Sequence, residues 1–151
     1  MSNITEVCNF NPATMPKPLG MYSHVGSAPA GSVLFLAGQL STDESGQLVG
    51  KGDFTKQVET AFDNLGRLLG SLGADFDDVI SFNTYVVRPE DVETFFQIRR
   101  RLFPSLFRRK QYPPNNLFVL KQLFHPDYLF EIVAVAAITP RHDPNHKTDE
   151  E

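Results

Sequence analysis

The sequence predicts an α+β domain in which two helices cover one face of a mixed β-sheet. The length of 151 residues suits a single domain. Two segments place apolar residues at helical spacing, and five short apolar or alternating runs are typical of strands. Their order is strand, strand, helix, strand, helix, strand, strand, which favours helices packed against one sheet.

The first third of the chain predicts a connector followed by two strands. Residues 10–20 contain three prolines and are expected to be extended. Residues 32–36 form a short apolar run between glycines, which is typical of a buried strand. Residues 43–46 read Asp-Glu-Ser-Gly and predict a turn, with a short returning strand at 47–49.

A first helix is predicted from Asp53, the expected N-cap, to about Leu72, where Gly73 ends it. One apolar stripe follows the 3.6-residue period and should face the sheet. The stripe consists of Phe54, Val58, Ala61, Phe62, Leu65, Leu68, Leu69 and Leu72.

The second half predicts the remaining elements. Residues 79–87 alternate as a strand with Phe82 and Thr84 on one side, and a second helix should run from 92 to about 103, ending near Pro104. The last two strands are expected at 117–123 and 128–138, with a turn at 125–127. Residues 1–140 then form one domain, and residues 141–151, which hold no apolar side chain besides proline, are expected to be a disordered tail.

Composition excludes several classes of protein. The net charge of −4 argues against a general nucleic-acid-binding surface. No run approaches the roughly 18 apolar residues of a membrane span, and a single cysteine, Cys8, fits a reducing compartment, so we expect a cytoplasmic protein. The four histidines show no metal-ligand spacing and no phosphate loop or dinucleotide fingerprint is present, so neither metal nor cofactor is predicted.

Several short motifs occur in a fixed order along residues 21–138. They are Met21-Tyr22-Ser23, Ala37-Gly38-Gln39, the helical amides Gln57 and Asn64, and Phe130-Glu131-Ile132. In order and spacing the chain resembles the Rid (YjgF/RidA) family. The resemblance implies a chorismate-mutase-like fold, a homotrimer, and hydrolysis of reactive enamines or imines to carbonyl compounds and ammonia. It also implies structural roles for Gln57 and Asn64.

Glu131 is the strongest candidate catalytic residue, because it interrupts a strand that is otherwise apolar or small. From the pattern alone it either points to water or is buried and functional, and burial would raise its pKa toward the range useful for proton transfer. The resemblance implies the second reading, with Glu131 in an inter-subunit cleft where it positions the attacking water.

Tyr22, Ala37 and Gly38 are further pocket candidates. Tyr22 could simply pack its ring with its hydroxyl in solvent, whereas the resemblance implies that it closes the ligand pocket from one subunit. A glycine at position 38 lets the backbone approach a ligand closely. Family members often carry serine where this chain has Ala37, so one pocket hydroxyl is missing.

The chain departs from the family at Asn116, where the deaminases carry an arginine that holds the substrate carboxylate. If the gap in the preceding loop is placed differently in the comparison with the family, Asn115 takes this position instead. Two residues after Asn116, where family members carry a cysteine, this chain has Phe118. Arg99 or Arg109 could compensate by reaching the cleft, or these arginines could belong to a solvated helix face.

Three functions are compatible with these residues. The first is a deaminase of a small enamine or imine, with a carboxylate-bearing substrate that is not the usual 2-imino acid. The second is a non-catalytic small-molecule-binding or partner protein that retains the trimer clefts. The third, an RNA-cleaving activity, is supported only by the cations at 99–101 and 108–110.

Overall fold

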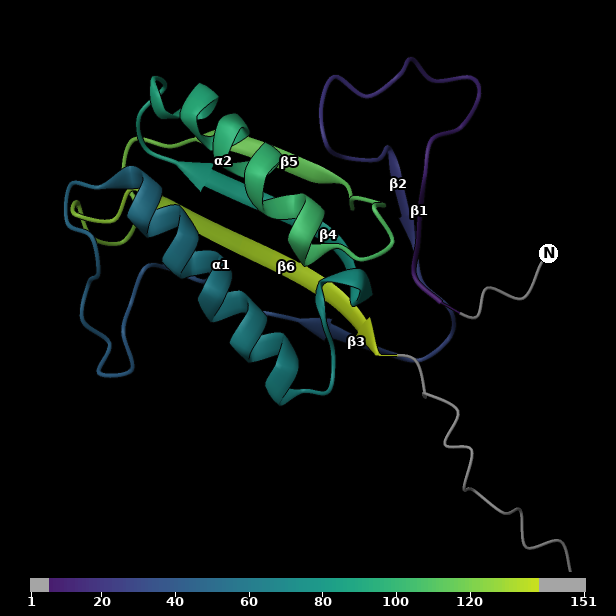
Figure 1. Cartoon of the computed structure of the whole chain (residues 1–151), viewed down its shortest axis with the longest axis horizontal. Coiled ribbons are helices and arrows are strands. Elements are labelled where there is room, and N and C mark those ends of the chain that lie inside the picture. The colour runs from purple at the N-terminus through teal and green to yellow at the C-terminus, as the bar shows by residue number, and fades with distance from the viewer. Residues whose placement is uncertain (1–5, 139–151) are drawn as a thin grey trace, which may run out of the picture.

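The sheet on which the site is built joins segments from both halves of the chain (Figure 1). The computed structural model describes residues 6–138, so the predicted tail at 141–151 lies outside the described residues. The strands are β3 (Ser32–Phe35), β4 (Val79–Val86), β5 (Asn115–Val119) and β6 (Phe130–Ile138). Their order is β3-β6-β4-β5; β4 and β5 are parallel and the other pairs are antiparallel, which confirms the mixed sheet.

A separate pair of short antiparallel strands, β1 (Cys8–Phe10) and β2 (Val25–Ser27), lies beside the sheet (Figure 1). The proline-rich connector links these two strands. The backbone of β2 passes close to the main sheet at Gly26. A Cβ built on this glycine would lie 2.2 Å from the carbonyl oxygen of Ile80. The close approach fixes the position of the N-terminal segment relative to the start of β4.

Helix α1 (Phe54–Ser71) has the predicted bounds because both of its caps are in place. The Asp53 carboxylate accepts a hydrogen bond of 2.9 Å from the backbone N–H of Lys56. At the other end Gly73 has a φ of 73°, a conformation that suits glycine at a helix terminus. A one-turn 3-10 helix, η1 (Phe76–Asp78), then leads into β4.

Helix α2 (Asp91–Leu106) is longer than predicted, because it continues through Pro104 to Leu106. A proline in the last turn removes one backbone hydrogen bond. The neighbouring Phe103 and Phe107 are 1% and 0% exposed, so core packing holds the final turn in place. The N–H of Phe107 still donates to the carbonyl of Phe103 at 3.0 Å.

Three strand predictions also need correction. The returning strand at 47–49 is a single bridge between Thr42 and Leu48. β5 covers 115–119 and not 117–123, because it pairs only with β4, whose own strand ends at Val86. β6 begins at Phe130, since the N–H of Tyr128 is used in the preceding turn, where it donates to the carbonyl of His125.

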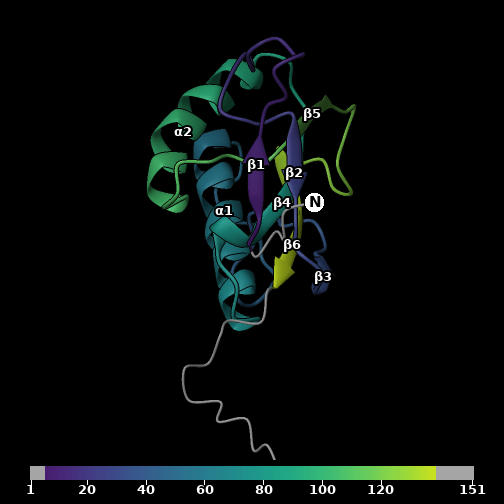
Figure 2. The same cartoon turned by 90° about the vertical axis from the view of Figure 1, so that its right-hand side faces the viewer.

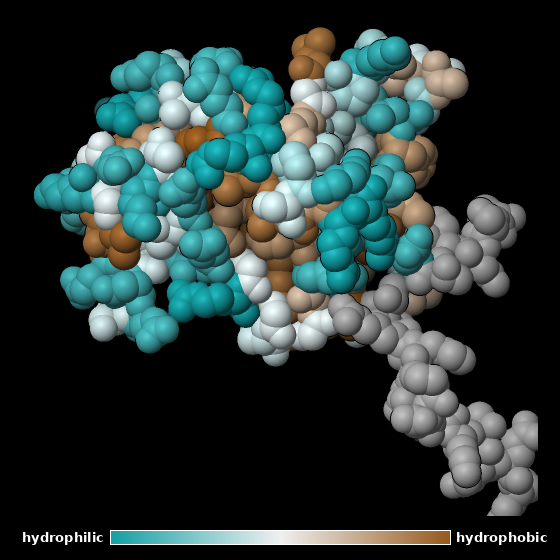
Figure 3. Space-filling model, viewed as in Figure 1, coloured by the Kyte–Doolittle hydropathy of each residue, from teal (hydrophilic) through white to brown (hydrophobic). Residues whose placement is uncertain are grey.

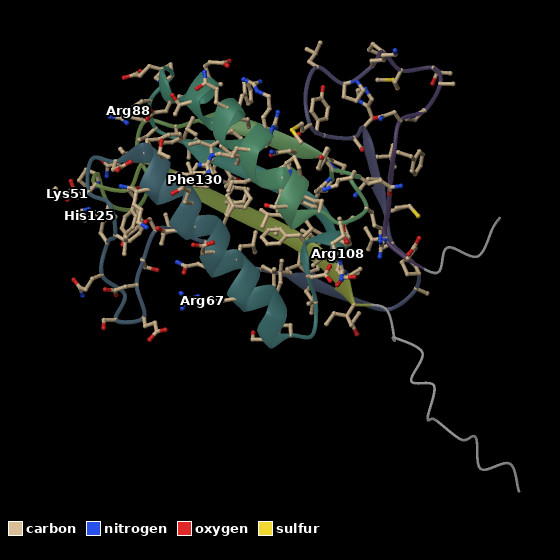
Figure 4. All side chains as sticks on the ribbon, in the orientation of Figure 1. Lys51, Arg67, Arg88, Arg108, His125 and Phe130 are labelled. Carbon is tan, nitrogen blue, oxygen red and sulfur yellow. The ribbon has the colours of Figure 1, made fainter. Side chains whose placement is uncertain are left out.

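The two faces of the sheet differ in what covers them. Both helices lie against one face, and no helix of residues 6–138 covers the other (Figure 2). On the helix side, Phe130 lies over β6 between α1 and α2 (Figure 4). A cluster of aromatic rings fills this core, which explains the high phenylalanine content. Its members include Phe62, Phe82, Phe95, Phe103, Phe107 and Phe130.

The outer surface of the helix side is largely hydrophilic, with apolar side chains between the helices (Figure 3). Two helical amides face inward nevertheless. Gln57 donates to the carbonyls of Gly50 and Asp127 and accepts from the N–H of Leu129, while Asn64 donates to the carbonyls of Leu40 and Thr42. The predicted structural role of these amides is therefore confirmed. No helix within the described residues is long and apolar enough to cross a membrane.

Candidate functional site

Glu131 lies on the face of the sheet that the helices leave open. Along β6 the buried Phe130 and Ile132 face the helices, so the side chain between them points the other way. Its cross-strand neighbour on β4 is Tyr85. The carboxylate has no hydrogen-bond or ion-pair partner among residues 6–138, and partial burial raises its pKa above the ordinary value for glutamate.

Gly38 determines where the Glu131 carboxylate can lie. The backbone of Gln39 exchanges hydrogen bonds of 2.8 and 3.1 Å with Ile132, which holds the chain after β3 against β6. A Cβ built on Gly38 would lie 1.8 Å from Oε1 of Glu131. Only glycine leaves room for the carboxylate here. Ala37 beside it is exposed, and its carbonyl accepts a hydrogen bond from the Gln39 side chain.

Asn116 and Phe118 share the open face with Glu131. The parallel register pairs them with Asn83 and Tyr85 of β4. Nδ2 of Asn116 donates to Oδ1 of Asn83 at 3.1 Å, and the ring of Phe118 stacks on Tyr85 with centroids 5.5 Å apart. The surroundings of the carboxylate on this face are thus amide and aromatic, with no arginine from β5.

The open face also carries exposed apolar side chains. Phe35 on β3 is 83% exposed, and Val33 and Phe118 are each nearly half exposed. Val133 and Val135 of β6 lie on the same face between these residues, because they alternate with the buried positions. A face of this composition is typical of a surface that packs against another protein chain.

Tyr22 and Arg99 lie elsewhere, in a cavity of about 390 Å³ between α2, β5 and the segment before β2. Asn115 contributes to the same cavity from β5. The Tyr22 hydroxyl accepts a hydrogen bond from the N–H of Leu19, and its ring contacts His24 edge-on. Sequence reasoning did not predict the remaining lining residues, which are Leu19, Gly20, Met21, Phe96, Arg100 and Leu117.

Arg99 is a buried cation, 7% exposed. The centre of its guanidinium lies 4.9 Å from the ring centroid of Phe96, and a Cβ built on Gly20 would lie 2.7 Å from Nη2. Its buried Nε has no hydrogen-bond partner. Burial lowers the pKa of Arg99, and repulsion from Arg100 adds to this effect. An arginine remains protonated in such a site.

The neighbouring cations, in contrast, have partners within the described chain. Arg100 pairs with Glu93, Arg101 with Glu59 and Arg108 with Asp75 and Asp77, while Lys110 donates to the carbonyl of Pro104. Arg109 donates to the carbonyl of Val7 and pairs with Glu6, so it anchors the N-terminal segment and does not reach the cavity. Of the two arginines suggested for the cleft, Arg99 lines this cavity and Arg109 does not.

Within one chain the cavity and the Glu131 carboxylate are on opposite faces of the sheet. The Thr84 hydroxyl, which is fully buried beneath the helices, donates to Oδ1 of Asn115 at 2.8 Å. The next residue, Asn116, points to the open face. Each chain consequently carries two separate clusters of candidate residues, one centred on Arg99 and Tyr22 and one on Glu131 and Gly38. We call these two clusters half-sites.

The described residues contain no group of three or more histidine, cysteine, aspartate or glutamate side chains that could hold a metal ion. The polar groups of the two half-sites are instead a carboxylate, amides, a tyrosine hydroxyl and a guanidinium. These groups can bind a small polar molecule and transfer protons.

Comparison with known proteins connects this arrangement to a family. The model of the family described as Endoribonuclease L-PSP matches residues 12–138. A RutC family protein of Pyrococcus abyssi is 30% identical over 122 residues, covering 80% of this chain and 89% of the relative. The 3-aminoacrylate deaminase RutC of Acinetobacter baylyi is 28% identical over 128 residues, covering 84% and 94%.

Solved structures agree with the sequence relatives. The conserved Rid family protein YyfB from Yersinia pestis, a protein of unknown function, superposes with a TM-score of 0.77 at 27% identity, covering 88% of this chain and 99% of that one. Escherichia coli TdcF, solved with bound serine, has the same fold with a TM-score of 0.63 at 21% identity, covering 82% and 92%.

The fold and the matched motifs define a small α+β protein with the Rid architecture. This chain belongs to the Rid (YjgF/RidA) family, some members of which are named as enamine or imine deaminases.

Proposed function

We propose that the protein hydrolyses a small enamine or imine to a carbonyl compound and ammonia, with Glu131 positioning and activating the water. The observation that supports this most directly is the unpaired carboxylate of Glu131, which is held against Gly38 on an apolar strand. Partial burial raises the pKa of Glu131, which brings the carboxylate closer to the range in which it can both accept and return a proton.

The complete site is proposed to form between two chains of a homotrimer. The resemblance places the family's matching glutamate in an inter-subunit cleft and has the matching tyrosine close it from one subunit. The two half-sites of this chain fit such a division, because Tyr22 and Glu131 lie on opposite faces of one sheet. The exposed Val33, Phe35 and Phe118 supply an apolar surface for the contact between chains.

The chemistry requires only proton transfers and positioning. Water forms a C–O bond to the imine carbon, gives one proton to Glu131, and the π electron pair of the C=N bond moves to nitrogen. Glu131 then returns the proton to nitrogen, which gives a carbinolamine. Glu131 next takes the hydroxyl proton of the carbinolamine and delivers it to the amino nitrogen. The C–N bond breaks, its electron pair leaves with ammonia, and the oxygen electron pair completes the carbonyl. An enamine enters the same route after tautomerisation, in which its carbon end gains a proton and its nitrogen loses one to give the imine. Holding the reactants together is sufficient for an intrinsically easy hydrolysis.

A second candidate function is a binding or partner protein that retains the clefts without turnover. Asn116 favours it, because the position of the family's arginine carries no charge, and Phe118 makes the open face bulkier. RNA cleavage has less support, since five of the six cations at 99–101 and 108–110 have partners within the described chain.

Ammonia release from freshly generated imines and enamines tests the proposal. The panel includes 2-aminoacrylate, bulkier 2-imino acids and an aminomuconate-type compound. We expect release faster than in buffer, abolished in Glu131→Ala and retained in Glu90→Ala, a control that removes an exposed glutamate with no hydrogen bond to the α2 N-terminus. If the protein accelerates ammonia release from none of these compounds, the binding function is favoured. Unchanged ammonia release in Glu131→Ala would exclude the proposed role of this residue.

A further inference from the structure

We propose that Arg99 is the carboxylate anchor of this protein's cleft, so that its substrates carry a carboxylate on an apolar body. That the bound acid is a substrate rests on the proposed function, but binding of a carboxylate at Arg99 can be tested without turnover.

Arg99 has no counter-charge among residues 6–138. Arg99 is 7% exposed and forms no hydrogen bond or ion pair with any residue from 6 to 138, although the cations around it are paired. A buried cation without a partner lowers the stability of the empty protein. A ligand that brings a negative charge into the cavity would therefore be bound with both Coulombic attraction and charge-assisted hydrogen bonds.

The cavity wall combines hydrogen-bond donors with apolar side chains. The buried Nδ2 of Asn115 also lacks a partner, so the unpartnered polar atoms here, Nε of Arg99 and this amide, are both donors. Leu19, Met21, Phe96 and Leu117 supply apolar walls. A volume of about 390 Å³ accommodates a small organic molecule, and donors beside apolar walls select an acid with an aliphatic or aromatic body.

Strand β5 supplies no arginine to the cavity. Asn116 faces away from the cavity, toward the open face, and its amide is bonded to Asn83. The cation therefore comes from α2 and approaches from the helix side of β5. The ring of Phe96 beneath the guanidinium holds it in a fixed orientation without neutralising its charge.

The test compares a carboxylate with its uncharged amide. We expect 4-methyl-2-oxopentanoate, a branched 2-oxo acid, to bind in calorimetry and to raise the thermal unfolding midpoint, and 4-methyl-2-oxopentanamide to do neither. Arg99→Met should weaken binding of the acid at least about ten-fold, as expected for loss of a charge-assisted pair. The matched control Arg101→Met removes a cation that pairs with Glu59 and does not line the cavity, and should bind as the wild type does.

Stability of the empty protein separates an anchor from a structural arginine. Arg99→Met should unfold at the same temperature as the wild type or higher, because an apolar side chain replaces an uncompensated buried charge. A lower midpoint, or carboxylate affinity within three-fold of wild type, would overturn the proposal. Equally strong binding of inorganic phosphate would overturn the assignment of an organic acid.

Failure of the Arg99 anchor can be distinguished from failure of the proposed hydrolase function. Glu131→Gln should lose turnover while keeping its affinity for the oxo acid within about two-fold, since the two half-sites use different side chains. Carboxylate binding that depends on Arg99 in a protein without turnover would support the anchor and refute the hydrolase. Turnover that is indifferent to Arg99→Met would support the hydrolase and refute the anchor.

Discussion

Replacing Gly38 with alanine should damage the site through steric displacement alone. The new Cβ would lie 1.8 Å from Oε1, 2.6 Å from Cδ and 3.0 Å from Cγ of Glu131. Ordinary C···O contacts are about 3.3 Å or longer, so the carboxylate must move by more than about 1 Å. Gly38 does not have a positive φ, and alanine therefore introduces no backbone strain.

A misplacement of about 1 Å can lower a rate by about 100-fold, which corresponds to roughly 2.7 kcal/mol in transition-state stabilisation. We expect this loss in kcat/KM for ammonia release, with a thermal unfolding midpoint close to that of the wild type. Gly70→Ala is the matched control, because its Cβ would meet no atom within 4 Å and alanine favours a helix.

A double substitution checks that the effect acts through Glu131. Gly38→Ala combined with Glu131→Gln should be no slower than Glu131→Gln alone, since there is no carboxylate left to displace. Activity of Gly38→Ala within three-fold of the wild type would refute the reasoning, because the side chain would then be free to function from another position.

Three further predictions concern charge, packing and assembly. Because burial raises the pKa of Glu131, the wild type should lose stability as pH rises from the ordinary glutamate range through the raised pKa. Glu131→Gln should remove this loss, and urea unfolding at acidic and neutral pH measures the difference. Gln57→Leu should lower the free energy of unfolding by about 2–4 kcal/mol, since it leaves the N–H of Leu129 and two carbonyls unpaired, and urea titration reports it. Phe35→Asp should shift the protein to smaller assemblies in light scattering, whereas an unchanged mass would place the subunit contact elsewhere.

Features encoded locally could be predicted from the sequence. The carboxylate of Asp53 and the glycine at position 73 define the ends of α1 through contacts within a few residues, and the structure has both. The end of α2 was mispredicted because Pro104 acts locally, whereas Phe103 and Phe107 hold the last turn through contacts with β4 and η1. Tertiary packing here outweighs the loss of one hydrogen bond.

The division of the site could not be predicted, because it depends on strand register. A shift of one residue in β5 exchanges Asn115 and Asn116 between the cavity and the open face. The sequence identified both asparagines but could not decide between the faces. Likewise it identified Arg99 without showing that the charges of Arg100 and Arg101 are neutralised by Glu93 and Glu59, which lie 7 and 42 positions from their respective arginines.

The placement of the half-sites on opposite faces has a consequence for mixed assemblies. If each cleft takes Arg99 from one chain and Glu131 from the next, a subunit defective in one half is complemented by a subunit defective in the other. Co-refolding Arg99→Met with Glu131→Gln, each impaired alone, would then regenerate intact clefts, about a quarter of the total at equal mixing. In a cell that produces both alleles, two loss-of-function mutations in this one gene would behave as partially complementing, a pattern usually taken to indicate two genes.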